Sequence, residues 1–454
     1  MPEHIKLKRG FDINLVGKPA RKVAESPLSD TFAIKPTDFL GLLRPKVTVK
    51  EGDTVKAGTP ILFDKKMDAV MYCAPVSGEV VEIKRGERRV LLEVKILADK
   101  TIEHEKFQEH SISEIPSLSK ESVVETMLKS GVWPQILQRP YGVVANPKDT
   151  PKAIFISAFD TSPLAPDYDV LLKGQSSFFE AGIEVLKKLT SGRVHLGINA
   201  DAEVSSVVSV KGVDVHKFSG PHPAGNVGVH IHHIAPIGKG EVVWTVDPYG
   251  VAQIGKLFLN GIYDCSKTIA LTGSEVKEPQ YYQTYQGACL DKIFEGKLKN
   301  DHVRHISGNV LTGHKVAADG YLGFYHHQLT VIPEGDYYEF LGWMKPTTNK
   351  LSFHRALGLL SFLNPKKEYV LDSNMRGEER AFVQTGIYQQ VIPMDILPEY
   401  LLKAIMAEDY EDMEALGIYE VIEEDVALCE FVDISKHDIQ HIIREGINLI
   451  RETS

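Results

Sequence analysis

Two stretches of the chain repeat apolar residues at helical spacing. The first, residues 177–189, has an apolar face made of Phe179, Ile183, Leu186 and Leu189. Ser177 and Glu180 have the spacing of a capping box, which predicts that this helix begins near Ser177. The second stretch, residues 249–261, ends in Asn260-Gly261, a pair that typically stops a helix.

Short apolar runs of strand type alternate with these helices. They lie at residues 152–161, 193–199 and 213–219, and we expect a short helical segment between the last two. Such alternation predicts a parallel, right-handed α/β sheet of Rossmann-like type. Ligands of these sheets bind beyond the carboxyl ends of the strands, so Asp160 marks a candidate cleft. A turn or capping role for Asp160 is the alternative.

Earlier in the chain, short strands are separated by glycine turns. The stretch VKEGDTVKAGTPIL at residues 49–62, followed by APVSGEVVEI at 74–83, resembles the two halves of a biotinyl or lipoyl barrel-sandwich. A working carrier needs its modified lysine on a hairpin tip between the halves. Lys65 and Lys66 stand slightly out of register there and no methionine precedes them. We therefore predict the barrel without the prosthetic arm; a biotin or lipoyl carrier is the alternative.

The segment SGPHPAGNVGVHIHHIAPIG, residues 219–238, is the most unusual part of the chain. We interpret its second half as a strand, on which His230 and His232 would share one face. Such a pair could hold a metal ion, line a cleft or form satisfied structural contacts, and no carboxylate or cysteine in the segment completes a metal site. The glycines would cradle a phosphate only if a helix followed directly, and the pattern indicates a strand.

The C-terminal half is expected to contain two further units. Strand-like runs with a helical piece near residues 288–294 predict a small β-grasp (SLBB-like) unit. An isoleucine stripe predicts a C-terminal helix through Ile439, Ile442, Ile443, Ile447 and Ile450. The dense acidic stretch from Glu408 to Asp425 suits a solvated helical face or a docking surface for a basic partner.

The expected fold class is therefore an α/β multidomain chain. Its expected units are an N-terminal arm with a barrel-sandwich at 1–100, the Rossmann-like unit at 101–257, the β-grasp unit at 258–330 and a mostly helical region at 331–454.

Composition narrows the function classes. With 43% hydrophobic and 25% charged residues, the chain can bury several cores, which excludes global disorder. A net charge of -10 opposes a nucleic-acid partner. No apolar run reaches the ~18 to 20 residues that cross a bilayer, and the N-terminus lacks a secretory core, so we expect a cytoplasmic location with membrane association through partners. The cysteines lack the spacing of a zinc or iron–sulfur site.

Five motifs carry a resemblance that covers essentially the whole chain. They are FISAFDTSPLAPD (155–167), GPHPAGNVGVHIHHI (220–234), RHISGNVLTGHKV (304–316), YLGFYHHQLTVIPEG (321–335) and LGWMKP (341–346). The sequence is similar to the A-subunit family of the bacterial sodium-translocating NADH:quinone reductase. The resemblance implies a peripheral subunit on the cytoplasmic face of the bacterial inner membrane, with integral membrane subunits as partners and ubiquinone or menaquinone as a possible ligand.

Redox-active relatives of that family, such as the flavin-bearing subunit of respiratory complex I, hold FMN and NADH on a glycine-rich loop and carry CxxCxxC clusters. The corresponding region of this chain contains Trp133, Pro134 and Arg139, whose side chains would keep backbone amides away from a phosphate. Cys429 is unaccompanied, because Asp433 stands where family members often have a second cysteine. We expect no bound FMN, NADH, iron–sulfur cluster or metal, and no catalytic residue in the isolated chain.

Two functions from different classes follow. In the first, the chain helps to bind the quinone of the complex, and residue type together with the family link selects the candidates His222, His230, His232, Tyr325 and His326. In the second, the chain has a purely structural role in assembly and is a degenerate flavoprotein scaffold without a ligand. Quinone binding by the isolated chain would separate the two.

Overall fold

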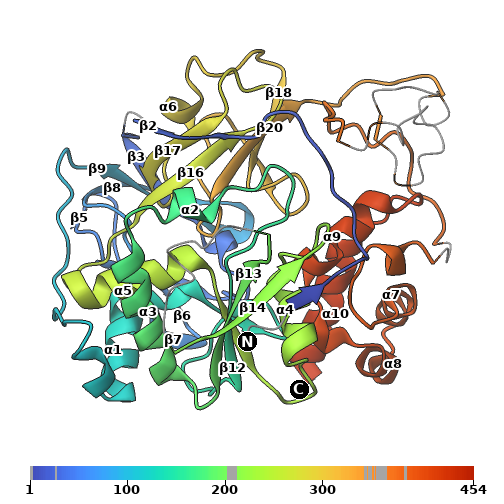
Figure 1. Ribbon diagram of the computed structural model, residues 1–454. Coiled ribbons are helices and arrows are strands. Elements are labelled where there is room, and N and C mark those ends of the chain that lie inside the picture. The colour runs from blue at the N-terminus through green and yellow to red at the C-terminus, as the bar shows by residue number, and fades with distance from the viewer. Residues whose placement is uncertain are drawn as a thin grey trace.

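The computed structural model describes residues 4–25, 28–201, 212–341, 345, 350–351, 353, 364, 366–382 and 386–453. Most of the LGWMKP motif and the helical segment expected between residues 199 and 213 lie outside this part of the chain. Figure 1 shows the described elements grouped into a barrel, an α/β sheet, a second mixed sheet and a helical C-terminal region.

The barrel-sandwich consists of two small sheets. One has the order β3-β9-β8-β5, with β3 at Thr31–Ile34, β9 at Leu91–Ala98, β8 at Gly78–Arg85 and β5 at Thr54–Val55. The other has the order β4-β6-β7, with β4 at Pro45–Val47, β6 at Pro60–Asp64 and β7 at Met67–Cys73. Lys65 and Lys66 form the exposed turn between β6 and β7, so they do stand on a hairpin tip. That they carry no prosthetic group stays a prediction.

The α/β unit is built on a seven-stranded sheet of order β1-β14-β13-β12-β15-β10-β11. Its strands are β1 (His4–Lys6), β14 (Asp214–Ser219), β13 (Arg193–Asn199), β12 (Ala153–Ser157), β15 (Val243–Val246), β10 (Ile136–Arg139) and β11 (Val143–Val144). The first five run parallel to one another, as the alternating pattern predicts. Strand β10 is antiparallel to its neighbours β15 and β11.

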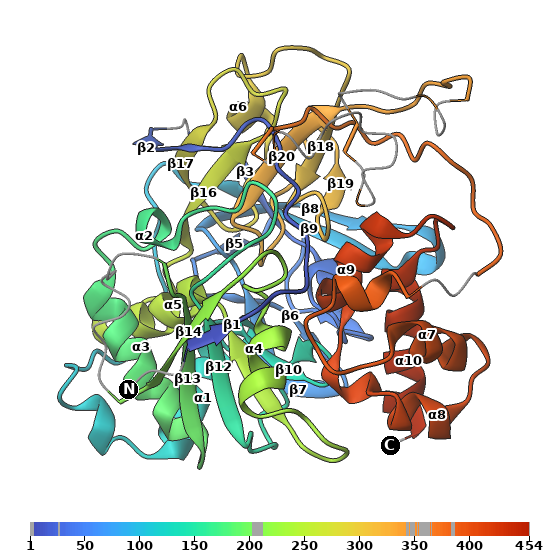
Figure 2. The ribbon, with the colours of Figure 1, turned by 45° about the vertical axis from the view of Figure 1, so that its right-hand side comes forward.

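Helices cover both faces of this sheet. Helices α1 (Lys120–Ser130), α3 (Ser176–Leu189) and α5 (Pro248–Asn260) lie on one side, and α4 (Val227–Ile234) lies on the other, facing the C-terminal helices (Figures 1 and 2). The short helix α2 (Tyr168–Leu171) connects β12 to α3.

Both predicted helices are present. The predicted apolar face of α3 is buried. The capping box is wrong, however, because α3 begins at Ser176 and Gln175 precedes it without a side-chain cap. Helix α5 is capped by Asp247, whose carboxylate accepts a hydrogen bond from the Tyr249 amide, and it ends at Gly261 with φ 59° as the Asn-Gly pair predicts.

Helices α3 and α5 pack tightly because each presents a glycine at their contact. A methyl group at Gly182 would overlap the Val251 carbonyl oxygen, and one at Gly255 would overlap the Phe178 carbonyl oxygen. The backbones of the two helices therefore touch directly.

The β-grasp unit has a sheet of order β19-β18-β20-β16-β17-β2. Its own strands are β16 (Ser266–Thr272), β17 (Gln280–Tyr285), β18 (Val303–Ser307), β19 (His314–Val316) and β20 (Gln328–Pro333), and its helix α6 spans Asp291–Phe294. The expected domain limits at 257/258 and 330/331 fall inside α5 and β20.

The N-terminal arm joins these units together. Strand β1 is an edge of the α/β sheet, whereas β2 (Ala20–Ala24) pairs with β17 at the edge of the β-grasp sheet. Between them, Leu15 forms a bridge with Tyr369. The dark blue segment in Figure 2 follows this path across the molecule.

The C-terminal region contains α7 (Pro398–Met406), α8 (Tyr410–Ala415), α9 (Glu423–Val432) and α10 (Ile439–Thr453). The predicted isoleucine stripe of α10 packs into the core of this region, with Ile442 only partly buried. Within the described ranges, no helix has the length and apolar character needed to pass through a bilayer.

Candidate functional site

A cleft of about 270 Å³ opens at the carboxyl ends of β12 and β15, where the α/β topology places ligands. The α/β unit contributes most of its walls, and the β-grasp unit and the start of α9 close it. We call it the Asp160 cleft, and its lining includes Leu137, Arg139, Asp160, Tyr168, His222, Asp247, Tyr325 and Glu424.

Two of the five predicted quinone-binding residues line this cleft. The Nδ1 atom of His222 lies 3.1 Å from the Thr161 hydroxyl, and the ring also has a hydrogen bond with the Thr161 backbone. Burial lowers the pKa of His222 to about 4, so the imidazole is neutral at pH 7. Tyr325 lies on the opposite unit, and its hydroxyl donates to the Pro134 carbonyl at 2.7 Å.

His230 and His232 lie on a helix, so the predicted strand and shared face are wrong. Residues two positions apart on a helix such as α4 project about 200° apart around its axis, so the two imidazoles point to opposite sides. The ring of His230 stacks on Phe218 with centroids 3.8 Å apart, and its Nε2 bonds the Ala224 carbonyl. His232 bonds the Glu420 carboxylate at 2.5 Å. Neither lines the cleft, and both serve the packing of α4.

The interpretation of the glycine-rich loop is also wrong, since α4 follows β14 directly after residues 220–226. The glycines of this loop allow other parts of the chain to approach its backbone closely. A methyl group at Gly225, for example, would overlap the Phe159 carbonyl oxygen. One at Gly228 would overlap the Asp425 carboxylate. Asp425 thus takes the place beside the N-terminus of α4 where an anion would otherwise lie.

His326 lies within the β-grasp unit and does not line the cleft. Its Nδ1 atom is 2.9 Å from the Ser307 hydroxyl, and burial lowers its pKa to about 3. Of the predicted residues, the structure therefore brings together His222, Tyr325, Asp160 and Arg139.

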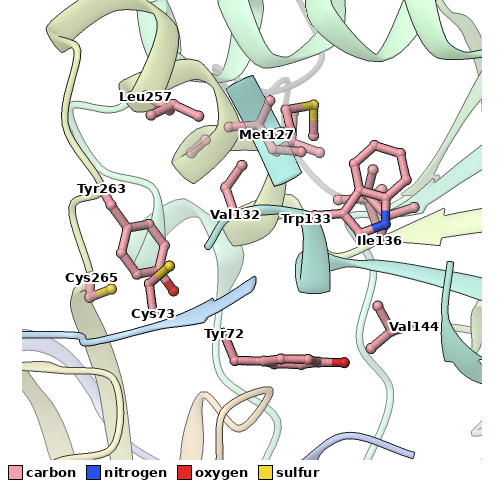
Figure 3. Packing of buried hydrophobic residues seen from close by; sticks show 14 of the residues in the cluster. Tyr72, Cys73, Met127, Val132, Trp133, Ile136, Val144, Leu257, Tyr263 and Cys265 are labelled. Carbon is pink, nitrogen blue, oxygen red and sulfur yellow. The ribbon is translucent and has the colours of Figure 1, made fainter. Parts of the chain in front are cut away.

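Trp133 belongs to the core beside the cleft. Its indole nitrogen donates to the Ala145 carbonyl at 2.8 Å, and its ring meets Trp244 edge to face. Figure 3 shows it packed among buried apolar side chains such as Ile136. It is not a lining residue, so the cleft beside Asp160 is open rather than plugged by it.

Arg139 forms a buried ion pair that no local pattern predicts. Its guanidinium donates to Asp425 at 2.8 Å and to Glu424 at 2.5 Å, about 285 residues further along the chain. Burial raises the pKa of Glu424 to about 7 even though Arg139 opposes that shift. The pair fixes α9 against β10 at the edge of the cleft.

Two carboxyl groups of the cleft have pKa values that are shifted in opposite directions. Burial raises the pKa of Asp160, although its Oδ1 accepts a hydrogen bond from the Ser162 amide at 2.8 Å. Burial also disfavours ionised Asp247, but His327 and Tyr168, whose donor atoms lie 3.0 and 2.7 Å away, lower its pKa overall. The site therefore favours the neutral form of Asp160 and the ionised form of Asp247, relative to a free carboxyl group.

Asp247 and Tyr168 line the cleft but were not predicted from the sequence. Asp247 directly precedes Pro248 at the start of a predicted helix and directly follows a buried strand. That position, the carboxyl end of a parallel strand, was a usable signal. Within the described residues, no three His, Cys, Asp or Glu side chains are grouped closely enough to hold a metal ion.

Three family models match successive parts of the chain. Residues 5–99 match the NqrA N-terminal barrel-sandwich hybrid domain, residues 118–263 the NqrA second alpha/beta domain, and residues 268–318 the NQRA C-terminal domain. These assignments confirm the predicted barrel-sandwich, α/β and SLBB-like fold classes.

Curated relatives match over the full length. The A subunit of the Na(+)-translocating NADH-quinone reductase from Yersinia pestis bv. Antiqua (strain Angola) is 39% identical over 449 residues, which is 99% of each chain. The chain belongs to this A-subunit family. The A subunits from Serratia proteamaculans (strain 568) and Neisseria meningitidis serogroup B (strain ATCC BAA-335 / MC58) are both 37% identical, over 99% of each chain. Membership in the A-subunit family confirms the resemblance stated from the sequence motifs.

Among solved structures, an NAD+-reducing [NiFe]-hydrogenase in the air-oxidised state overlaps 78% of this chain and 67% of that chain. Its sequence identity is 10% and the TM-score is 0.35. A TM-score this low supports no argument about the A-subunit family.

Proposed function

We propose that this chain is a peripheral subunit on the cytoplasmic face of a sodium-translocating NADH:quinone reductase, and that its Asp160 cleft binds the quinone headgroup. Ubiquinone or menaquinone would be the ligand, and integral membrane subunits would be the partners. The family membership supports the first part, and the position and chemistry of the cleft support the second.

The size of the cleft suits a single aromatic ring. Its volume of about 270 Å³ is close to the lower end of the roughly 300 to 1,000 Å³ found for small-molecule pockets. Apolar side chains of Leu137, Phe159 and Leu311 provide contact area for the ring. A headgroup would fill this space, and an isoprenoid tail would leave through the open side.

Hydrogen-bond donors in the cleft match the two carbonyl oxygens of a quinone. The Nε2 of neutral His222 can donate to one oxygen when the Thr161 hydroxyl donates to Nδ1. Asp160 can donate to the other when its carboxyl group is protonated, and burial shifts its pKa in that direction. Reduction to a quinol takes two electrons, supplied by the assembled enzyme from NADH, and two protons.

No flavin, nicotinamide or iron–sulfur cluster is part of this proposal. The region expected to correspond to the phosphate loop holds buried Trp133 and Pro134, and the anion position beside α4 is filled by Asp425. The four cysteines are buried and unpaired.

A titration of the full-length chain with a short-chain ubiquinone, followed by tryptophan fluorescence, tests the cleft. We expect saturable binding that weakens at least tenfold in His222→Leu and in Asp160→Ala, since each removes a donor to a carbonyl oxygen. His232→Gln is the matched control, because His232 lies on the same glycine-rich segment but outside the cleft.

Binding that is unchanged in both cleft variants would contradict the cleft assignment. If wild-type chain shows no saturable binding and the complex still assembles, the second function applies, a scaffold without a ligand. The Arg139 ion pair, which joins two units across the cleft, is the observation that favours that alternative.

A further inference from the structure

The tip of the β8–β9 hairpin has two arginines at turn positions that usually hold Asn and Gly. Arg88, with φ 52° and ψ 24°, and Arg89, with φ 61°, are successive residues in the left-handed region. The Val90 amide donates to the Glu87 carbonyl at 3.1 Å, which closes a tight turn. Turns of this hand strongly prefer Asn-Gly, because other side chains are strained there. Two arginines at these positions therefore oppose the folding preference of the turn.

Positive charge gathers at this tip and is not neutralised. Arg85 reaches the Arg89 carbonyl at 3.1 Å, and no ion pair found within the described chain involves Arg85, Arg88 or Arg89. Lys84, in contrast, is paired with Glu93 at 3.0 Å. The three arginines and the single carboxylate of Glu87 give the tip a charge of +2, in a chain whose net charge is -10.

Exposed apolar side chains flank these arginines. Val90 is 56% exposed and Leu92 is 36% exposed, and Val81 on the neighbouring strand is 40% exposed. The glycine before the turn, Gly86, packs against the Leu92 side chain, so the tip is held as one unit. Arginines interleaved with exposed apolar residues are typical of surfaces that lie in the headgroup region of an anionic bilayer.

We propose that this hairpin tip, residues 85–92, docks directly onto the surface of an anionic phospholipid bilayer. Arg85, Arg88 and Arg89 contact lipid phosphates, and Val90 and Leu92 enter the boundary between headgroups and acyl chains. Charge complementarity favours the bilayer as the partner, because the tip is basic where the rest of the chain is acidic. Its apolar side chains Val90 and Leu92 are 56% and 36% exposed. The contact would orient the protein independently of its protein partners and of the Asp160 cleft.

Flotation of the full-length chain with phosphatidylglycerol–phosphatidylcholine vesicles tests this proposal. The turn chemistry provides a variant that separates binding from folding, Arg88→Asn with Arg89→Gly. We expect this variant to unfold at the same or a higher urea concentration than wild type, because Asn-Gly suits the turn. Its partition coefficient should fall roughly 25-fold, since each arginine contributes roughly fivefold near an anionic surface.

The control is Lys187→Gln with Lys188→Gln, which removes the same charge from helix α3 and should change binding by less than twofold. Wild type should bind pure phosphatidylcholine weakly, should lose binding in 0.5 M salt, and should bind several-fold more weakly as Val90→Ser. Equal binding of wild type and the Asn-Gly variant would overturn the proposal, as would equal binding to neutral and anionic vesicles. Complete competition by millimolar glycerol phosphate would also overturn it, because it would indicate a site for one phosphate instead of a surface contact.

Discussion

At the scale of single residues, Arg139 holds the start of α9 at the edge of the Asp160 cleft. Its guanidinium is 3% exposed and contacts Asp425, which is fully buried. A buried ion pair contributes little net stability, but removal of one partner leaves an uncompensated charge in the core. The pair is therefore a structural link between the α/β unit and α9.

We expect Arg139→Met to lower the free energy of unfolding by about 3 to 5 kcal/mol, because the Asp425 carboxylate would lose its counter-charge. Urea denaturation at pH 7 measures this loss. Arg193→Gln is the control, since the Arg193–Asp214 pair is exposed and should change stability by less than about 1 kcal/mol. Similar small losses in both variants would show that Asp425 finds another partner.

The candidate site could be predicted from the sequence only where topology alone places a residue. Asp160 follows a buried strand, and a parallel sheet places that position at a cleft, so its location was predictable. His222 and Tyr325 were chosen by residue type, and the structure brings them to the same cleft from different units. The partner of Arg139 was not predictable, because a contact over about 285 residues leaves no periodic signal.

At the scale of elements, the short segment of α4 explains the wrong prediction of a strand. In VGVHIHHI, Val227, Val229 and Ile231 alternate with other residues, and this period of two coexists with a helical period. Eight residues are too few to separate the two periods. The longer helices α3 and α5 were predictable because their apolar faces repeat over three or more turns.

The close contact between α3 and α5 predicts that Gly255→Ala changes stability in the direction opposite to that expected from helix propensity. Helix propensity alone would make Gly255→Ala stabilising by about 1 kcal/mol. We expect a loss of about 1 to 3 kcal/mol in urea denaturation, because the added methyl group overlaps the Phe178 carbonyl oxygen and the backbones must separate.

Gly446→Ala in α10 is the matched helical control for this change. The neighbour of Gly446 is the buried Ile405 side chain, 2.7 Å from the added methyl group, so the loss should be smaller than in Gly255→Ala because a side chain and not a backbone carbonyl must shift. A Gly255→Ala variant more stable than wild type would mean that α3 and α5 are less closely packed than described.

At the scale of the whole molecule, buried histidines make stability depend on pH. Burial lowers the pKa of His195 and His222 to about 4, and that of His230 and His326 to about 3. Between pH 6.5 and 4 the unfolded chain therefore binds protons at these sites that the folded chain does not. Glu424, whose pKa is raised to about 7, and Asp160, whose pKa is also raised, have the opposite effect, but each offsets at most one proton against the four histidines.

We expect the free energy of unfolding to fall as the pH is lowered from 6.5 to 5, by at least about 1.4 kcal/mol per pH unit, which is the value for one net proton. Urea denaturation at pH 6.5, 6.0, 5.5 and 5.0 measures the slope. His195→Gln removes one titrating group and should reduce the slope by up to about 1.4 kcal/mol per pH unit. A stability that is constant or rises toward pH 5 would contradict the neutral state of these histidines.

The path of the N-terminal arm also has a consequence for synthesis on the ribosome. Residues 4–24 are synthesised long before the strands with which they pair. Strand β1 can pair only after β14 at residues 214–219 has been made, and β2 only after β17 at residues 280–285. At roughly 5 to 20 residues per second, the delay before β2 can pair lasts roughly 10 to 50 s. The arm is thus among the last parts of the chain to pack, and its two strands complete the edge of the α/β sheet first and the edge of the β-grasp sheet later.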